Sequence, residues 1–455
     1  MDVTHVHRFL AIVLLGLSGA GAFAAAEAPD FPKLSFTDRT LDNGLRVIAL
    51  EDRATPTVAV QVWYRVGSKD DPPGRSGFAH LFEHLMFKNT ERMPPETLDR
   101  LTEDVGGENN AFTADDMTAY FETVPSNHLE RLLWAEAERM ASLTVDEANF
   151  RTERDVVKEE FRQSVLAPPY GEFGEWIIKQ SFARHPYKRP TIGNIEELDA
   201  ASLEEVRRFH STYYRPDNAV LAVAGDFDPS ELQRWVDQYF GPVPKPPGSV
   251  PRVAVTEPPR PGERTVTTTG EKAPLPALGV TFLGPPAVDP QAPALRVLEQ
   301  ILSGGESSRL YRSLVYEKEL AQSVDFSADL RADLGLLVFQ MVLASGVEVA
   351  AARTALMNQI DRVREEAVTD EELSIAKNQI LARELAGLET VAGRAMALGE
   401  AAAVRGDPSL VNSDLPKIAA VTATEVREAA RAWLKNPVVL EYLPSPRAKD
   451  KEADQ

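Results

Sequence analysis

The chain of 455 residues is too long for one ordinary hydrophobic core, so its length predicts two or more domains. Hydrophobic residues make up 43% of the chain and charged residues 26%, which are globular values and argue against wholesale disorder. The net charge of -20, from 69 acidic and 49 basic residues, argues against nucleic acid as the main partner. An acidic surface suits a basic peptide or protein partner, although solubility is the simpler explanation of the charge.

The chain contains no cysteine. This absence excludes disulfides, thiolate metal sites, a cysteine nucleophile and lipid attachment through a cysteine. Any transition-metal site must therefore use histidine and carboxylate ligands.

The N-terminus is typical of a secretory signal. Arg8 precedes an apolar run from Phe9 to Phe23, and small residues follow it. This run is shorter than the roughly 20 residues that a membrane-spanning helix needs, and three glycines interrupt it. We predict a signal peptide over residues 1–26 and a periplasmic location, with an uncleaved N-terminal anchor as the alternative. No later stretch is long and apolar enough to predict a stable membrane anchor.

The first half of the mature chain mixes strand and helix patterns. Apolar, β-rich runs bounded by turn signals predict strands over residues 44–50, 57–64, 119–124 and 219–225. Amphipathic patterns predict helices over residues 78–87, 130–143, 150–166 and 202–213. We expect an α+β fold in which helices pack on one face of a mostly antiparallel sheet.

The helix predicted over residues 78–87 contains the pattern His80-Leu81-Phe82-Glu83-His84. His80 and His84 lie one turn apart on the same face, so both can bind one ion. Glu83 borders that face, where it can act on a water molecule at the metal. Since the chain has seven histidines, this pattern would arise by chance in roughly one chain in a hundred. Paired histidines in a buried core are the alternative.

A third ligand for such a site is expected from a carboxylate. Zinc in a hydrolytic site takes three protein ligands and leaves a fourth position for water. Glu153 and Glu160 are seven residues apart, which places them on one face of the helix predicted over residues 150–166. By composition alone, this segment would be a solvated, charged helix.

A proline-rich segment over residues 241–264 predicts a stiff linker between two domains. It separates an N-terminal domain over residues 34–240 from a C-terminal domain over residues 265–445, and a polar tail follows over residues 446–455. Both domains have about the usual size.

Three sequence patterns recur in the same order in the two domains. Their first members start at His80, Asp146 and Glu205, and their second members lie 216, 224 and 220 residues later, at Arg296, Asp370 and Glu425. Such nearly constant offsets indicate a duplicated domain with small loop insertions. Convergence of short helical patterns is the alternative.

The motif at residues 80–84, followed about 75 residues later by the acidic segment 153–160, resembles the inverzincin family, which includes pitrilysin, insulin-degrading enzyme and mitochondrial processing peptidase. The resemblance covers nearly the whole mature chain and includes Asn43-Gly44-Leu45, Gly77-Phe78-Ala79 and His185-Pro186-Tyr187.

The resemblance implies a metallopeptidase site. In the family pattern, His80, His84 and Glu160 bind one zinc ion per chain. Glu83 is the general base, and Glu153 orients a ligand. Glu159 points about 100° away from Glu160 on the helix, so it is the weaker candidate.

The same resemblance implies a substrate-binding edge strand that contains Asn110, Ala111 and Phe112. An extended peptide would add to this strand through backbone hydrogen bonds, which tolerates varied side chains. An ordinary hairpin is the alternative.

The second domain departs from the family pattern in two places. Arg296 and Gln300 stand at the repeat positions of the two histidines, and Lys377 stands at that of Glu153, so we expect no zinc there. Family members with complete sites carry an Arg and a Tyr, seven apart, where this chain has Val315 and Gln322. The chain therefore resembles the zinc-bearing subunit of a heterodimer whose homologous partner supplies the Arg/Tyr pair.

Together these patterns predict a zinc-dependent endopeptidase that hydrolyses peptides or unfolded polypeptide segments. One alternative is a non-catalytic scaffold or binding subunit of the same fold. Another is a peptidase directed at one folded precursor.

Overall fold

The computed structural model describes residues 31–446 of the chain. The signal peptide predicted over residues 1–26 lies outside the described residues, as does nearly all of the polar tail predicted over residues 446–455. Among the helices that are described, none is long and apolar enough to cross a membrane.

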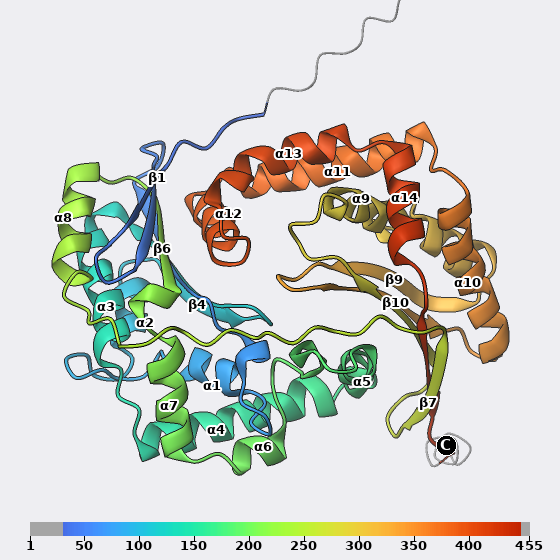
Figure 1. Ribbon diagram of the computed structural model, residues 1–455, viewed down its shortest axis with the longest axis horizontal. Coiled ribbons are helices and arrows are strands. Elements are labelled where there is room, and N and C mark those ends of the chain that lie inside the picture. Colours follow the sequence, from blue (N-terminus) through green and yellow to red (C-terminus); the bar gives the residue numbers. More distant parts are fainter. Residues whose placement is uncertain (1–30, 447–455) are drawn as a thin grey trace, which may run out of the picture. The chain divides into compact units, whose positions relative to one another are not determined.

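The first domain is built on a six-stranded sheet with the strand order β1-β2-β6-β3-β5-β4 (Figure 1). All neighbouring strands are antiparallel except β2 and β6, which run parallel. The strands are β1 (Thr37–Thr40), β2 (Arg46–Glu51), β3 (Thr57–Tyr64), β4 (Glu108–Thr113), β5 (Thr118–Pro125) and β6 (Ala219–Gly225).

The second domain is built on a five-stranded sheet with the strand order β7-β11-β8-β10-β9. Here β7 and β11 run parallel and the other neighbours are antiparallel. The strands are β7 (Arg264–Gly270), β8 (Ala277–Gly284), β9 (Ala321–Asp329), β10 (Gly335–Leu343) and β11 (Val438–Pro444).

The two sheets have the same topology once β1 is set aside. Strands β2, β6, β3, β5 and β4 correspond in order and direction to β7, β11, β8, β10 and β9. This agreement confirms the expected α+β fold of two duplicated domains with mostly antiparallel sheets. Residues 240–263, all of them described, hold no helix or strand between the domains, in keeping with their density of proline.

Helices cover the face of the first sheet on which its core residues gather. Their buried side chains come largely from the amphipathic patterns of the sequence. The helices are α1 (Phe78–Leu85), α2 (Thr97–Glu103), α3 (Leu129–Ser142), α4 (Glu147–Phe161), α6 (Ile195–Asp199), α7 (Leu203–Tyr213) and α8 (Pro229–Tyr239). Helix α5 (Gly171–Ser181) instead packs on the second sheet, against β8 and β11. Short 3₁₀ segments are η1 (Ser68–Asp70), η2 (Ser126–His128), η4 (Pro186–Lys188) and η5 (Pro216–Asn218).

The helices of the second domain pack largely around a core of their own. They are α9 (Ala292–Ser303), α10 (Val349–Glu365), α11 (Asp370–Gly387), α12 (Val391–Ala403), α13 (Val411–Ala420) and α14 (Ala423–Trp433), with a 3₁₀ segment η7 (Pro408–Leu410). Two π-helical segments occur in the part of the chain that the structure describes, η3 (Arg162–Leu166) directly after α4 and η6 (Tyr311–Glu317) after α9.

Helix α12 crosses from the second domain onto the other face of the first sheet, where it contacts β3 and β6 (Figure 1). Its apolar side chains join a separate core with residues of the sheet, including Trp63. A side chain at Gly399 would place its Cβ 2.1 Å from the indole nitrogen of Trp63, so the close approach of the helix requires glycine there. The first sheet is thus covered by helices on both faces, whereas the sequence predicted helices on one face only.

Candidate metal centre

Helix α1 is held firmly at its N-terminal end. Gly77, directly before the helix, has a φ of 97°, a left-handed conformation that glycine adopts without strain. The buried carboxylate of Asp71 accepts hydrogen bonds from the backbone N–H groups of Gly77 (2.7 Å) and Ala79 (2.9 Å). These bonds satisfy two amide groups that have no partner within the helix. Burial raises the pKa of Asp71 to about 7, against the effect of both bonds.

The apolar face of α1 fixes the rotation of the helix. Phe78, Leu81, Phe82 and Leu85 are all fully buried in the core of the first domain. The hydroxyl of Tyr120 on β5 also donates a hydrogen bond to the Phe82 carbonyl, at 3.0 Å. The histidine face of the helix is therefore turned toward α4, which α1 contacts.

Helix α4 supplies the acidic side of the site. Asp146 caps its first turn by accepting a hydrogen bond from the N–H of Asn149, at 2.9 Å. Glu153 and Glu160 lie two turns apart on this helix. Glu159 instead points to solvent, with its side chain 55% exposed and paired with Arg162.

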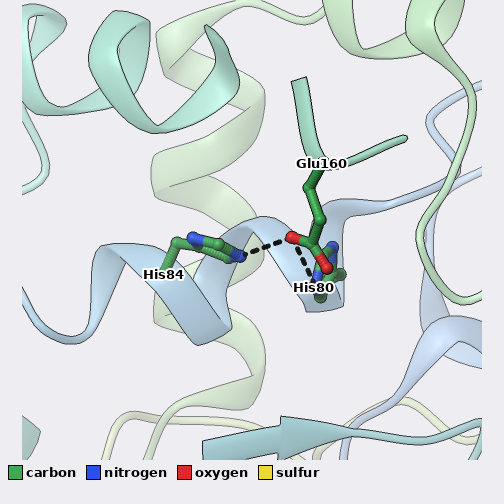
Figure 2. Close-up of side chains that lie close together, drawn as sticks. All are labelled: His80, His84 and Glu160. Atoms are coloured by element: carbon green, nitrogen blue, oxygen red, sulfur yellow. Dashed lines mark ion pairs between the residues drawn. The ribbon is translucent and has the colours of Figure 1, made fainter. Parts of the chain in front are cut away.

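His80, His84 and Glu160 converge on one point (Figure 2). One atom of each lies within 4.8 Å of the other two. The Oε2 atom of Glu160 is 3.6 Å from Nε2 of His80 and 3.3 Å from Nε2 of His84. Within residues 31–446, no other group of three potential ligands comes as close together.

Burial and acidic neighbours act differently on the two histidines. Burial, with a smaller effect of the neighbouring His84, lowers the pKa of His80 to about 3, so its imidazole is neutral at pH 7. Burial also disfavours charge on His84, but Glu153 and Glu160 outweigh it and raise the pKa of that residue. Two imidazoles and a carboxylate are the donor set that zinc takes in hydrolytic sites, where water is the fourth ligand. The residues present therefore fit zinc.

Glu153 lies behind His84. Its Oε2 is 3.7 Å from Nδ1 of His84, and its Oε1 is 2.7 Å from Nζ of Lys88. Burial alone would raise its pKa, but both neighbours together lower it, so the side chain is ionised. This arrangement lets Glu153 fix the ring of His84. Lys88 was not singled out from the sequence, although it lies one helical turn after His84.

Glu83 lies beside the ligand cluster, with its Oε2 4.0 Å from Nε2 of His80. The hydroxyl of Thr113, the last residue of β4, donates a 2.6 Å hydrogen bond to the same oxygen. Burial raises the pKa of Glu83, while the Thr113 bond opposes this effect. A carboxylate whose pKa is raised, next to a set of metal ligands, can take a proton from water. Thr113 was missed by the sequence analysis because it is 30 residues away from Glu83.

Asn110, Ala111 and Phe112 lie on β4, the edge strand of the first sheet. Among the described strands, β4 pairs with β5 alone, so its other edge is free for hydrogen bonds to an added strand. Strand β4 also contacts α1, which places this edge next to the ligand-bearing helix.

The second domain differs at the corresponding place. Arg296 and Gln300 replace the histidines on α9, and no metal-type cluster is found there among the described residues. Val315 lies in η6 and Gln322 is an exposed residue of β9, so neither offers the donors expected from family members with complete sites.

Comparison with known proteins agrees with this architecture. Residues 46–194 match the family described as insulinase (peptidase family M16), and residues 200–380 match the peptidase M16 inactive domain. Zinc protease PqqE of Helicobacter pylori is 29% identical over 384 residues, which are 84% of this chain and 85% of that protein. The uncharacterized zinc protease ML0855 of Mycobacterium leprae is 30% identical over 431 residues, 92% of this chain and 93% of that protein.

The fold is shared with a solved structure as well. The crystal structure of a protease from Helicobacter pylori superposes with a TM-score of 0.87 at 25% identity, covering 91% of this chain and all of that one. Fold and site together define a two-domain α+β protein with a His-His-Glu centre in its first domain. The chain belongs to peptidase family M16, and the relatives above are named zinc proteases.

Proposed function

We propose that the protein is a zinc-dependent endopeptidase that hydrolyses peptides or unfolded polypeptide segments. The observation that carries this proposal is the convergence of His80, His84 and Glu160 with Glu83 at their side. Imidazole and carboxylate donors, with a carboxylate base adjacent, are what hydrolysis at a metal requires.

Each of the site residues has a role in this reaction. Zinc bound by the three ligands would polarise the scissile carbonyl and acidify a water molecule. Glu83 takes a proton from the attacking water and later passes it to the leaving amine. Thr113 holds one oxygen of Glu83, and Glu153 keeps the ring of His84 in place.

The substrate is proposed to bind as an extra strand on β4, along Asn110, Ala111 and Phe112. The open edge of β4 and its contact with α1 support this proposal. Recognition through backbone hydrogen bonds requires an extended chain, so peptides and unfolded segments would be accepted and compact proteins would not.

A homologous partner subunit is also proposed. Val315 and Gln322 occupy the positions at which an Arg and a Tyr would stabilise the developing oxyanion. Loss of such donors can lower the rate by orders of magnitude. A heterodimer in which the partner supplies the Arg/Tyr pair would restore them.

Export to the periplasm is proposed from the N-terminal sequence, where Arg8 and the apolar run from Phe9 to Phe23 have the character of a signal peptide. Fractionation of cells that express the full chain should find a processed form in the periplasm. A full-length chain in the cytosol would contradict this part of the proposal.

The test of the proposed function compares the wild type with Glu83→Gln, with and without the homologous subunit. Zinc content and cleavage of an unstructured peptide are measured for each. We expect one zinc per chain in both and a loss of activity of roughly 10²- to 10⁴-fold in the variant. Glu159→Gln, a neighbouring exposed carboxylate, serves as control and should keep full activity.

The other outcomes are equally informative. Undiminished cleavage by Glu83→Gln would rule out the assigned base. Zinc binding without any cleavage, even with the partner present, would favour the scaffold alternative.

A further inference from the structure

The loop between β9 and β10, residues 330–334 of the second domain, contacts the turn between β4 and β5, residues 114–117 of the first. The N–H of Ala332 donates a hydrogen bond to Oδ2 of Asp116, at 2.9 Å. Nη1 of Arg331 lies 3.2 Å from Oδ2 of Asp115. The turn at the end of β4 therefore meets the end of the β9–β10 hairpin (Figure 1).

Charged and polar groups from both domains form a cluster at this contact. Nζ of Lys69 lies 2.7 Å from Asp116 and 3.0 Å from Asp333, with the side chains of Lys69 and Asp116 only 14% and 8% exposed. The fully buried Tyr187 donates its hydroxyl hydrogen to Asp116, at 2.6 Å, and accepts one from the N–H of Asp333, at 3.1 Å. Both oxygens of Asp116 thus have partners, and they come from both domains.

Arg331 adds cation–π interactions to the same contact. Its guanidinium lies 4.9 Å from the ring centre of Tyr187 and 5.6 Å from that of Phe182, and its side chain is 7% exposed. A buried guanidinium is unfavourable without carboxylate partners, so Asp115 and Asp329 define where it can lie. The loop is therefore fixed in one position on the first domain.

The β4–β5 turn is held from the other side by η1. The backbone N–H of Ser68 donates to the carbonyl of Ala114, and that of Lys69 to the carbonyl of Asp115, both at 3.1 Å. A Cβ on Gly67 would lie 2.3 Å from the oxygen of Ala114, which shows how closely the backbones approach. The turn thus has little freedom to move while the β9–β10 loop is in place.

The turn leads directly to the general base. Thr113 immediately precedes it, and its hydroxyl donates the 2.6 Å bond to Glu83. A displacement of the turn would therefore move both this hydroxyl and the end of the edge strand. No other side-chain hydrogen bond to Glu83 is present among the described residues.

We infer that the β9–β10 loop of the second domain is a positioning element for the site in the first: it fixes the β4–β5 turn through Asp115 and Asp116, and the turn holds Thr113 against Glu83. The inference rests on the proposed function for the role of Glu83. It assigns a task in the reaction to a domain that has no metal ligands of its own.

The experiment is a double-mutant cycle between Asp116→Ala and Thr113→Val. Each single variant should lower kcat on the order of 10-fold, with KM and zinc content nearly unchanged, because the base is misplaced while ligands and edge strand remain. Since both act through one contact, the double variant should be no slower than the slower single variant. A product of the two effects, about 100-fold, would mean independent roles and would overturn the inference.

Conservative variants sharpen the test. Thr113→Ser keeps the hydroxyl and should retain most of the rate. Asp116→Asn keeps an oxygen acceptor but loses the charge opposite Lys69, so it should give a smaller loss than Asp116→Ala and serves if the alanine variant does not fold.

A second readout does not depend on activity. Amide hydrogen exchange of residues 108–118 should become faster in Asp116→Ala and in Asp116→Asn. Arg309→Ala, which breaks an ion pair with Glu372 within the second domain, is the matched control and should leave this segment unchanged.

The two readouts separate this inference from the proposed function. Unchanged exchange in both Asp116 variants would refute the positioning role even in an active enzyme. Faster exchange in a protein that cleaves no peptide would retain the link between loop and turn and remove the peptidase proposal instead.

Discussion

Arg296 and Glu384 form an ion pair, with Nη2 2.6 Å from Oε1, at the place in the second domain that corresponds to His80 and Glu160 in the first. Helices α9 and α11 pack together there, as α1 and α4 do around the ligand cluster. The guanidinium carries its own positive charge, so it satisfies the carboxylate without an ion. Lys377, at the position of Glu153, donates to a backbone carbonyl instead. A side-chain cation thus lies in the second domain at the place where the ligand cluster lies in the first.

Replacement of Arg296 by Met should leave the zinc content at one per chain. It should lower the free energy of unfolding by only about 0.5 kcal/mol, because the two side chains are 36% and 39% exposed and such pairs are weak. Metal analysis and urea unfolding measure the two effects. A change in zinc content would contradict the assignment of the metal to the first domain. His84→Ala, which removes a proposed ligand, should abolish zinc binding.

Glu153→Gln should weaken zinc binding by roughly 10- to 100-fold, because the ring of His84 loses a charged partner. Competition with a chelator of known affinity measures this change. Glu159→Gln on the same helix should bind zinc as the wild type does, since that side chain is exposed and paired with Arg162. Equal affinities in the two variants would argue against an orienting role for Glu153.

Asp71→Ala should lower the free energy of unfolding by about 1 to 3 kcal/mol, because two amide groups at the start of α1 lose their acceptor in a buried place. Asp71→Asn keeps an acceptor oxygen and should be milder. Urea unfolding at pH 7 distinguishes the two variants. If both destabilise the protein equally, the charge rather than the acceptor is the important property.

A dependence of stability on pH is expected from Glu372. The ion pair with Arg309, against a smaller opposing effect of burial, lowers the pKa of Glu372 from 4.5 to about 2. The folded protein binds this proton less readily than the unfolded chain, so the stabilisation is complete above about pH 4.5 and is lost as the pH falls toward 2.

The comparison with Glu372→Gln isolates this contribution. The difference in unfolding free energy between wild type and variant should be largest at pH 7 and should shrink between pH 4.5 and 2. Urea unfolding at several pH values provides the measurement. A difference that is the same at all pH values would show that the carboxylate is not titrating as described.

Strands and helices were predictable where local patterns determine them. The strand expected over residues 57–64 is β3 with the same bounds, because an apolar run there ends in turn signals on both sides. The helix expected over residues 150–166 begins earlier, since Asp146 caps it, and α-helical geometry ends at Phe161. The remainder continues as the π-helical segment η3, which the hydrophobic pattern alone does not distinguish.

The site was predictable only in part for a related reason. His80 and His84 lie at helical spacing, and a family pattern marks Glu160, so short-range sequence rules suffice for the ligands. Thr113 and Asp71 reach α1 from other segments, and no periodicity links them to it. The contact between the β9–β10 loop and the β4–β5 turn spans more than 200 residues, so only the folded chain reveals it.

Helix α12 gives the second domain a structural role that does not depend on metal ligands. It closes the core around Trp63 on the first sheet, so deletion of the metal-free copy would expose a broad apolar surface on the copy with the ligands. Selection for solubility and folding alone would therefore preserve the second domain without metal ligands. The second domain is then needed for the stability of the first, although Arg296 stands at the repeat position of a ligand.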